Sequence, residues 1–262
     1  MDHTAKKRFG QHFLTSARII ERIIDASIPG EGDAIVEIGP GQGAITGDLI
    51  KKHHNTFTAI ELDRDLIPLL KERFGSIERF SIIESDVLKV NFADCAPDKR
   101  QLTIVGNLPY NVGSIIILKM AEEREVIRKA YVMLQKEVGE RLTAICGTSE
   151  YSFLSVAIQT FATVKRLFTI PPGAFSPPPK VDSAFLEISF SHEPDMPKDY
   201  KRYTSIVSNA FSQRRKKVIN VLSRHYDKDT IAKFFADNSI NENARAENLT
   251  VKDYIRLYET LQ

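Results

Sequence analysis

The sequence has few cysteines and no long apolar run, and each shortage excludes a class of protein. Only Cys95 and Cys146 are cysteines, and neither belongs to a Cys-x-x-Cys or Cys/His cluster, so a disulfide framework and a zinc site are excluded. No stretch approaches the roughly 18 consecutive apolar residues of a membrane span, and no apolar region follows the basic residues 1–8 to make a signal peptide. We therefore expect a soluble, cytoplasmic protein without a metal.

The net charge is also small, +2 for 262 residues, but it is unevenly distributed. Residues 198–224 contain eight Lys and Arg side chains against one acid, which leaves the rest of the chain acidic. Clustered basic side chains neutralise phosphates and release counterions, the part of nucleic-acid affinity that does not depend on sequence. Arg214, Arg215, Lys216 and Lys217 are therefore candidates for RNA binding, and a solvated helix face is the alternative.

The order of apolar runs predicts an α/β fold. Residues 16–27 carry isoleucines at helical spacing and predict an amphipathic helix. Short apolar runs follow, and most of them end before Gly, Glu or Asn. Most neighbouring runs are separated by a segment long enough for a crossover helix, such as residues 49–53 and 66–74. The runs are residues 34–38, 57–60, 80–83, 102–105 and 131–134. This alternation predicts a mostly parallel sheet that is covered on both faces and binds its ligand at the carboxyl ends of the strands.

The pattern changes towards the C-terminus. Residues 153–161 predict a helix, and residues 164–170 and 184–190 predict two strands around a proline-rich loop. Beyond about residue 192 only helices are predicted, at 203–211, 217–222, 230–237 and 251–261. Residues 192–197 contain two prolines and are the expected linker. We therefore expect a large α/β domain over residues 1–191 and a small all-α domain over residues 192–262.

The first predicted strand runs into a glycine-rich turn with the sequence VEIGPGQG, residues 36–43. Glycines allow unusual backbone dihedrals and a close approach to a ligand. However, Gly39, Gly41 and Ala44 also satisfy the dinucleotide fingerprint Gly-x-Gly-x-x-Gly/Ala, which is typical of nicotinamide and flavin dehydrogenases. The turn alone therefore does not distinguish a dinucleotide from another nucleoside cofactor.

Two acids at the next strand ends favour a nucleoside without a pyrophosphate. Glu61 ends the second strand about twenty residues after the glycines, where a carboxylate can accept hydrogen bonds from both ribose hydroxyls. Asp86 follows the third strand, where it could accept a hydrogen bond from an adenine amino group. Each acid alone fits a solvated turn or a helix cap, but their order along the sheet predicts a cofactor site.

The fourth strand ends in Asn107, Leu108, Pro109 and Tyr110. The N6 amine of adenine is a poor nucleophile because its lone pair is delocalised into the ring. The Asn107 side-chain oxygen and the Leu108 carbonyl could each accept one amine hydrogen, Pro109 would stiffen the turn, and Tyr110 would stack on an extruded base. A bare turn is the alternative. Phe175, in the proline-rich loop 171–183, could close the other face of the base or fill the core of that connection.

An ordered series of motifs resembles the KsgA-type family of ribosomal RNA small-subunit adenine dimethyltransferases across essentially the whole chain. The motifs are KRFGQHFL (7–14), GPGQGAIT (39–46), the acids Glu61 and Asp86, NLPYN (107–111), FSPPPKVDSAF (175–185), NAFSQRRKKVINVL (209–222) and ARAENLTVKDYIRLYETL (244–261). The resemblance implies a Rossmann-like class I methyltransferase domain with a seven-stranded sheet and a small helical C-terminal domain that binds RNA. It further implies S-adenosylmethionine-dependent dimethylation of N6 on two adjacent adenines of the 3′-terminal hairpin of 16S rRNA, by a monomer acting on an immature small subunit.

The resemblance also assigns residues to roles. Contacts to the cofactor fall on His12, Leu14, Gly39, Glu61, Asp86 and Asn107. Roles at the target adenine fall on Asn107, Leu108, Tyr110 and Phe175. His12 and Leu14 are assigned by the resemblance alone, since nothing in their spacing points to a ligand.

Several other functions remain to be separated from this one. A large-subunit rRNA adenine methyltransferase of the antibiotic-resistance type shares the cofactor motifs and the Asn-Leu-Pro-Tyr centre, although the RRKK block and the full helical tail argue against it. DNA adenine methyltransferases usually carry an acid where Asn107 stands. A ribosome-assembly factor could keep the fold without catalysis, and a dehydrogenase would leave Tyr110 and the basic run unexplained.

Overall fold

The chain divides into two compact units. The computed structural model describes residues 11–191, 193 and 196–261, so the basic residues 1–8 and part of the predicted linker 192–197 lie outside the described residues. Unit 1 comprises Met1–Gly139 and Thr163–Phe190, and unit 2 comprises Glu140–Ala162 and Ser191–Gln262. The second unit therefore takes in residues 140–162, which the sequence-based division at 191 had assigned to the first.

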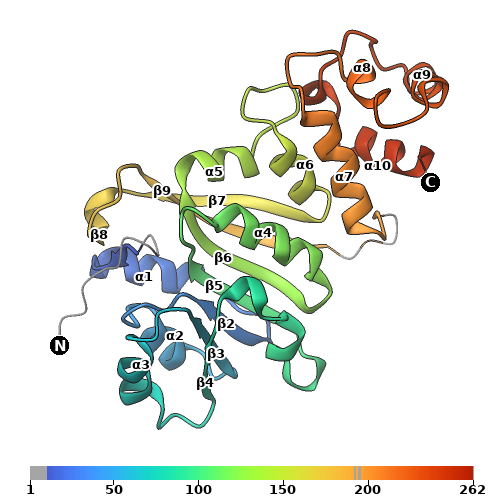
Figure 1. The fold of residues 1–262 in the computed structure, drawn as a ribbon. Coiled ribbons are helices and arrows are strands. Elements are labelled where there is room, and N and C mark those ends of the chain that lie inside the picture. The colour runs from blue at the N-terminus through green and yellow to red at the C-terminus, as the bar shows by residue number, and fades with distance from the viewer. Residues whose placement is uncertain (1–10, 192, 194–195, 262) are drawn as a thin grey trace. The chain divides into compact units, whose positions relative to one another are not determined.

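Unit 1 is built on a seven-stranded sheet with the order β4-β3-β2-β5-β6-β9-β7 (Figure 1). Its strands are β2 (Ala34–Ile38), β3 (Phe57–Glu61), β4 (Phe80–Glu84), β5 (Leu102–Asn107), β6 (Ile127–Gln135), β7 (Ala162–Ile170) and β9 (Ser183–Phe190). The pairs from β4 to β6 are parallel, and β9 is antiparallel to β6. β2 and β3 are buried along their whole length because helices cover both faces, which explains their continuous apolar sequence.

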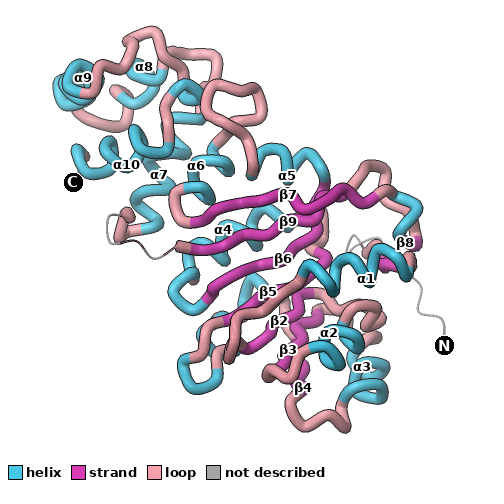
Figure 2. The backbone as a smooth tube through the Cα atoms, turned by 180° about the vertical axis from the view of Figure 1, so that it is seen from behind, coloured by secondary structure: helices cyan, strands magenta, loops and turns pink. Residues whose placement is uncertain are grey.

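The helices of unit 1 form a layer on each side of the sheet. They are α1 (Ala17–Ala26), α2 (Thr46–Lys52), α3 (Ile67–Phe74) and α4 (Gly113–Glu122). The short helix α5 (Lys136–Leu142) follows β6, and the division between the units falls within it. α1, α2 and α3 lie in front of the sheet in Figure 2, and α4 lies in front of it in Figure 1. Ile23 of α1 and Leu70 of α3 are fully buried in the same core cluster as Tyr131 of β6. The predicted helix at 16–27 is thus confirmed, whereas α4 was not predicted.

A small second sheet joins distant parts of unit 1. β1 (Phe13–Leu14) pairs antiparallel with β8 (Phe175–Ser176), with Leu14 opposite Phe175. The backbone amides of Thr15 and Ser16 both donate to the carbonyl of Ala174 and extend this attachment. The N-terminal segment, defined here as residues 11–14, is thereby held against the proline-rich loop.

Unit 2 is helical and has a core of its own. Its helices are α6 (Phe153–Gln159), α7 (Tyr200–Phe211), α8 (Val218–Leu222), α9 (Lys228–Asp237) and α10 (Val251–Thr260). Phe161 meets Tyr203 edge-to-face in the centre, with ring centroids 5.6 Å apart, and the buried Tyr203 hydroxyl lies 2.7 Å from the Thr160 hydroxyl. Side chains of Asp199, Asp227 and Thr250 cap α7, α9 and α10, which explains where these helices begin. In the part of the chain that the structure describes, no helix is long and apolar enough to cross a membrane.

Candidate functional site

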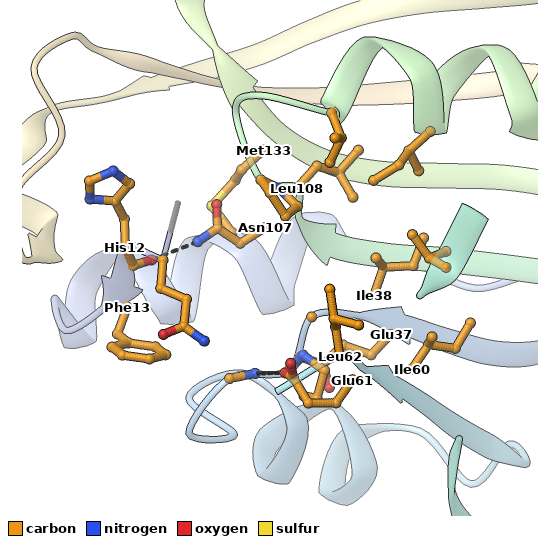
Figure 3. A pocket seen from close by; sticks show the side chains of 18 of the residues that line it. His12, Phe13, Glu37, Ile38, Ile60, Glu61, Leu62, Asn107, Leu108 and Met133 are labelled. Atoms are coloured by element: carbon orange, nitrogen blue, oxygen red, sulfur yellow. Dashed lines mark hydrogen bonds between the residues drawn. The ribbon is translucent and has the colours of Figure 1, made fainter. Parts of the chain in front are cut away.

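A cavity of about 240 Å³ opens in unit 1 at the carboxyl ends of the parallel strands (Figure 3). β3 lies on one side of β2 and β5 on the other, so the chain reverses its direction of crossover at this point, where open α/β sheets bind ligands. Eight of the predicted site residues line the cavity: His12, Leu14, Gly39, Glu61, Asp86, Asn107, Leu108 and Tyr110. The fold therefore brings together residues from five separate places in the sequence.

The glycine-rich turn needs glycine for two different reasons. Gly39 and Gly41 have φ angles of +65° and +59°, in the left-handed region that other residues avoid. A Cβ on Gly41 would also lie 3.0 Å from the ring of Phe13, in the N-terminal segment. The turn can therefore pass close beneath that segment and line the cavity with backbone that carries no side chain at Gly39 and Gly41.

Glu61 is held rigidly at the end of β3. One of its oxygens, Oε2, accepts a hydrogen bond from the Gly41 amide at 3.1 Å, and Oε1 accepts one from the Asp63 amide at 2.8 Å. Burial raises the pKa of the Glu61 carboxyl, and the hydrogen bonds from Asp63 and Gly41 oppose that shift. Both backbone donors favour the ionised form, so the carboxylate is oriented before any ligand arrives.

Asp86 follows β4 and caps the short 3-10 helix Val87–Lys89, because its Oδ1 accepts a hydrogen bond from the Leu88 amide at 3.0 Å. The cap and the cavity position are compatible, since a carboxylate has acceptor capacity for more than one donor. The sequence offered capping and ligand binding as alternatives for Asp86, and the structure allows both.

Glu37, a residue that the sequence reasoning missed, also lines the cavity. It lies within β2, is 1% exposed, and accepts a 2.6 Å hydrogen bond from the Thr46 hydroxyl. Burial raises its pKa to about 8, the Thr46 hydrogen bond opposes the shift, and the nearby charge of Glu61 adds to it. A carboxyl inside an otherwise apolar strand was the signal that could have identified Glu37.

Because of this raised pKa, we expect the stability of the Glu37→Gln variant to increase relative to that of the wild type as the pH rises from about 5 to 8. In that window the unfolded chain has released the Glu37 proton while the folded protein retains it, so the wild type loses stability at up to roughly 1.4 kcal/mol per pH unit. Glutamine does not titrate and still accepts the Thr46 hydrogen bond. Urea unfolding of both proteins at several pH values measures the difference.

The control for this substitution is Glu72→Gln on the exposed face of α3. It makes the same chemical change without touching the cavity. A stability difference between Glu37→Gln and wild type that does not vary from pH 5 to pH 8 would contradict the buried, protonated state assigned to Glu37.

The side-chain amide of Asn107 is oriented by the N-terminal segment (Figure 3). Asn107 Nδ2 donates a 2.9 Å hydrogen bond to the carbonyl of His12. A carbonyl can only accept, so the amide nitrogen must be on that side and Oδ1 on the other. Next to it, the Leu108 amide donates to the Met133 carbonyl at 3.1 Å, which ties the turn to β6.

Two contacts hold the N-terminal segment over the site. The Gln11 side-chain amide donates to Asp63 Oδ2 at 2.9 Å, and Asp63 is the residue whose own amide holds Glu61. His12 Nδ1 lies 2.7 Å from the Pro177 carbonyl and must be the protonated ring nitrogen in that bond. Through Gln11 and Asp63 the segment is thus linked to Glu61 at the end of β3. Through the His12 carbonyl it is linked to the side-chain amide of Asn107.

Tyr110 is placed by its ring and by its hydroxyl. Its ring stacks on that of His12, with centroids 5.4 Å apart and an interplanar angle of 27°. Its hydroxyl is hydrogen-bonded to Ser183 Oγ, and burial raises the pKa of Tyr110, an effect that the Ser183 hydrogen bond opposes. The phenol is therefore neutral and part of a fixed arrangement.

Phe175 lies next to Leu14 but outside the cavity. It is 4% exposed, belongs to the hydrophobic core of unit 1, and does not line the cavity. Its place opposite Leu14 in the β1–β8 pair favours the core-filling alternative. Stacking of Phe175 on a target base stays a prediction.

The predicted RNA-binding residues belong to unit 2. Residues 214–217 are exposed and lie in the turn between α7 and α8. Arg214 differs from the other three, because its guanidinium donates hydrogen bonds to the carbonyls of Ser149 and Tyr151. Arg214 therefore also supports the local structure of unit 2, which the charge pattern did not indicate.

Comparison with known protein families identifies one that spans this chain. A family model described as ribosomal RNA adenine dimethylase matches residues 2–262. A Pseudomonas aeruginosa protein named Ribosomal RNA small subunit methyltransferase A is 42% identical over 260 residues, covering 99% of this chain and 95% of the relative. A Xanthomonas oryzae pv. oryzae protein of the same name is 44% identical over 257 residues, covering 97% and 95%.

Two solved structures share the fold. A dimethyladenosine transferase from Plasmodium falciparum has a TM-score of 0.77 at 24% identity, covering 94% of this chain and 96% of that one. The 23S rRNA methyltransferase ErmE has a TM-score of 0.71 at 23% identity, covering 95% and 99%. At these identities the likeness concerns the arrangement of the strands and helices.

Proposed function

This chain belongs to the ribosomal RNA adenine dimethylase family, and from that premise we propose that it dimethylates N6 of two adjacent adenines in the 3′-terminal hairpin loop of 16S rRNA. It is an rRNA adenine dimethyltransferase, and its methyl donor is S-adenosylmethionine. Its first unit has the predicted Rossmann-like class I methyltransferase fold. Asn107 carries the proposal, because its amide is oriented by His12 within the same cavity as Glu61.

The cavity suits this cofactor on the evidence of its own donors and acceptors. The Glu61 carboxylate, held from behind by two backbone amides, is placed to accept hydrogen bonds from a ribose diol. Gly39 and Gly41 let the backbone approach without a Cβ. We assign Asp86 to the adenine amino group and the N-terminal residues His12 and Leu14 to the remaining wall of the cofactor site.

Methyl transfer by this site relies on positioning and electrostatics. The bound cofactor supplies an electrophilic methyl group on its sulfonium. We assign Asn107 Oδ1 and the Leu108 carbonyl to the two hydrogens of the adenine amine, which favours a pyramidal nitrogen with its lone pair free for attack. Tyr110 offers a stacking face to the extruded base. The alkylated amine loses its proton readily, so the site needs no strong base.

The direct test offers labelled S-adenosylmethionine to small ribosomal subunits that lack the modification, and then maps the labelled nucleotides. We expect four methyl groups per subunit on two adjacent adenines. Isolated large subunits serve as the parallel substrate, and label there instead would favour the antibiotic-resistance type of activity. Failure to bind S-adenosylmethionine in calorimetry, with tight binding of NAD, would overturn the proposal.

The proposal also covers the assembly state of the substrate, the oligomeric state of the protein and the contacts of unit 2 with RNA. We infer that the substrate is an immature small subunit, that the protein acts on it as a cytoplasmic monomer, and that unit 2 supplies RNA contacts through residues 214–217. The exposure of these residues in the turn between α7 and α8 supports that assignment. A non-catalytic assembly factor would bind the same subunits without transferring label.

Replacing Arg215, Lys216 and Lys217 together by glutamine should weaken binding to small subunits and flatten its dependence on salt. Each phosphate contact contributes roughly 0.7 to 0.9 to the slope of log K against log salt, so the loss of three contacts should reduce that slope by about 2 to 3. Arg214 stays unchanged because its hydrogen bonds support the fold of unit 2. Binding titrations at several salt concentrations measure the slope.

A second triple variant removes the same charge elsewhere in unit 2. Lys228 and Lys233 of α9 and Lys252 of α10 are exposed and suit this control. An equal reduction of the salt slope in both variants would show that only total charge matters and would contradict a contact made by residues 215–217.

A further inference from the structure

Ser183, the first residue of β9, has no role in the function proposed above, yet it reaches the reaction centre. Its side chain is completely buried, and its hydroxyl is hydrogen-bonded to the hydroxyl of Tyr110. Tyr110 lines the cavity, whereas Ser183 does not. A buried hydroxyl whose partner is a side chain of the cavity wall is well placed to control how that side chain is oriented.

The backbone around Ser183 is a rigid support. Ser183 pairs with Gln135 at the end of the β6–β9 ladder, and the amide of Lys136 donates to the carbonyl of Asp182 at 2.9 Å. Tyr110, in contrast, lies in the turn after β5, outside any strand. The hydrogen bond therefore ties a turn side chain to the central sheet through a residue more than seventy positions away.

Two contacts together hold the Tyr110 ring in place. The stack on His12 restrains one side of the ring, and the Ser183 hydroxyl restrains its far end. The hydroxyl lies on the axis about which the ring rotates, so the stack sets the ring plane and the Ser183 bond sets the direction in which the ring points from the backbone. Without the Ser183 bond the far end of the ring could swing about the Cα–Cβ bond. A base stacked on the ring would then turn with it, and the amine would move relative to Asn107.

We propose that Ser183 is a positioning residue for methyl transfer, which fixes the place of the Tyr110 ring on which the target adenine stacks. This inference rests on the proposed function and assigns Ser183 an effect through Tyr110 alone. Small displacements of a reacting group cost rate even when binding is retained. The loss of this hydroxyl should therefore lower kcat more than it raises KM for the subunit.

A double-mutant cycle on Ser183→Ala and Tyr110→Phe tests the proposal. Each variant removes one end of the hydrogen bond and keeps the ring. We expect each single variant to lower kcat about tenfold, and the double variant to be no slower than either, because one interaction is lost in all three. The affinity for S-adenosylmethionine, measured by calorimetry, should stay within twofold of wild type, and its stoichiometry counts folded sites in every variant.

Ser189→Ala is the matched control, since Ser189 lies on the same strand and its hydroxyl bonds Glu187 away from the cavity. It should leave kcat unchanged. A wild-type kcat for Ser183→Ala, or a double variant slowed about a hundredfold by two independent effects, would overturn the inference while leaving the proposed function intact. A wild-type protein that methylates no ribosomal subunit would instead overturn the proposed function.

Discussion

Asn107→Ala should lower the rate of methyl transfer to small subunits by at least about a hundredfold, the effect typical of removing one preorganised polar group from a transition-state site. Alanine removes the oxygen assigned to the adenine amine and also the bond to the His12 carbonyl. Subunit binding should largely survive, since we propose that it depends on the basic residues of unit 2. Single-turnover methylation and a separate binding titration measure the two quantities.

Asn55→Ala supplies a matched control. The Asn55 amide donates to the carbonyl of Asp33 at 2.6 Å, which is the same kind of bond, but Asn55 precedes β3 at the opposite end of the sheet from the cavity. Asn55→Ala should therefore lower stability and leave the single-turnover rate of the folded protein unchanged. Unchanged turnover in Asn107→Ala would refute the role assigned to Asn107 and would favour a reaction centre elsewhere.

Glu61→Gln should weaken the binding of S-adenosylmethionine by roughly a hundredfold, because hydrogen bonds to charged groups contribute about 1.5–3 kcal/mol each. Glutamine has the same shape but only one acceptor oxygen. The amides of Gly41 and Asp63 both donate to this side chain, so one of them would face an NH2 group. The side chain would then be misoriented as well as uncharged. Calorimetry on the free protein gives the change directly.

Glu84→Gln is the control for this change. Glu84 ends β4 directly beside Glu61 in the sheet register, but it is exposed, pairs with Arg64 and does not line the cavity. An equal loss of cofactor affinity in both variants would point to a general electrostatic effect of the strand ends. Unchanged affinity in Glu61→Gln would contradict its assignment to the ribose.

Much of the sheet could be predicted because buried parallel strands have continuous apolar sequences. The five predicted runs at 34–38, 57–60, 80–83, 102–105 and 131–134 all lie in strands, and their carboxyl ends do converge on the cavity. α4 was missed because it contains three consecutive isoleucines and lacks the polar face that marks an exposed helix.

The site was predictable where a residue ends a strand and unpredictable where a contact spans the chain. Glu61 and Asp86 could be found from their place after apolar runs. Glu37 was hidden inside such a run, and the bond from Asn107 to His12 joins residues 95 positions apart. A local sequence pattern cannot predict a contact between residues so far apart in the chain. The assignment of His12 to the site therefore came only from the family resemblance.

The β1–β8 pair has a consequence for how this protein is made. Its two strands are two residues each and are separated by some 160 positions, so the pair cannot form until the chain has been synthesised past Ser176. Non-local pairings of this kind tend to form late because a long loop must close first. The central strands β2, β3 and β5 emerge from the ribosome much earlier. A nascent chain can thus build most of its sheet while the wall formed by residues 11–14 is still unattached, and the cavity is completed only towards the end of translation.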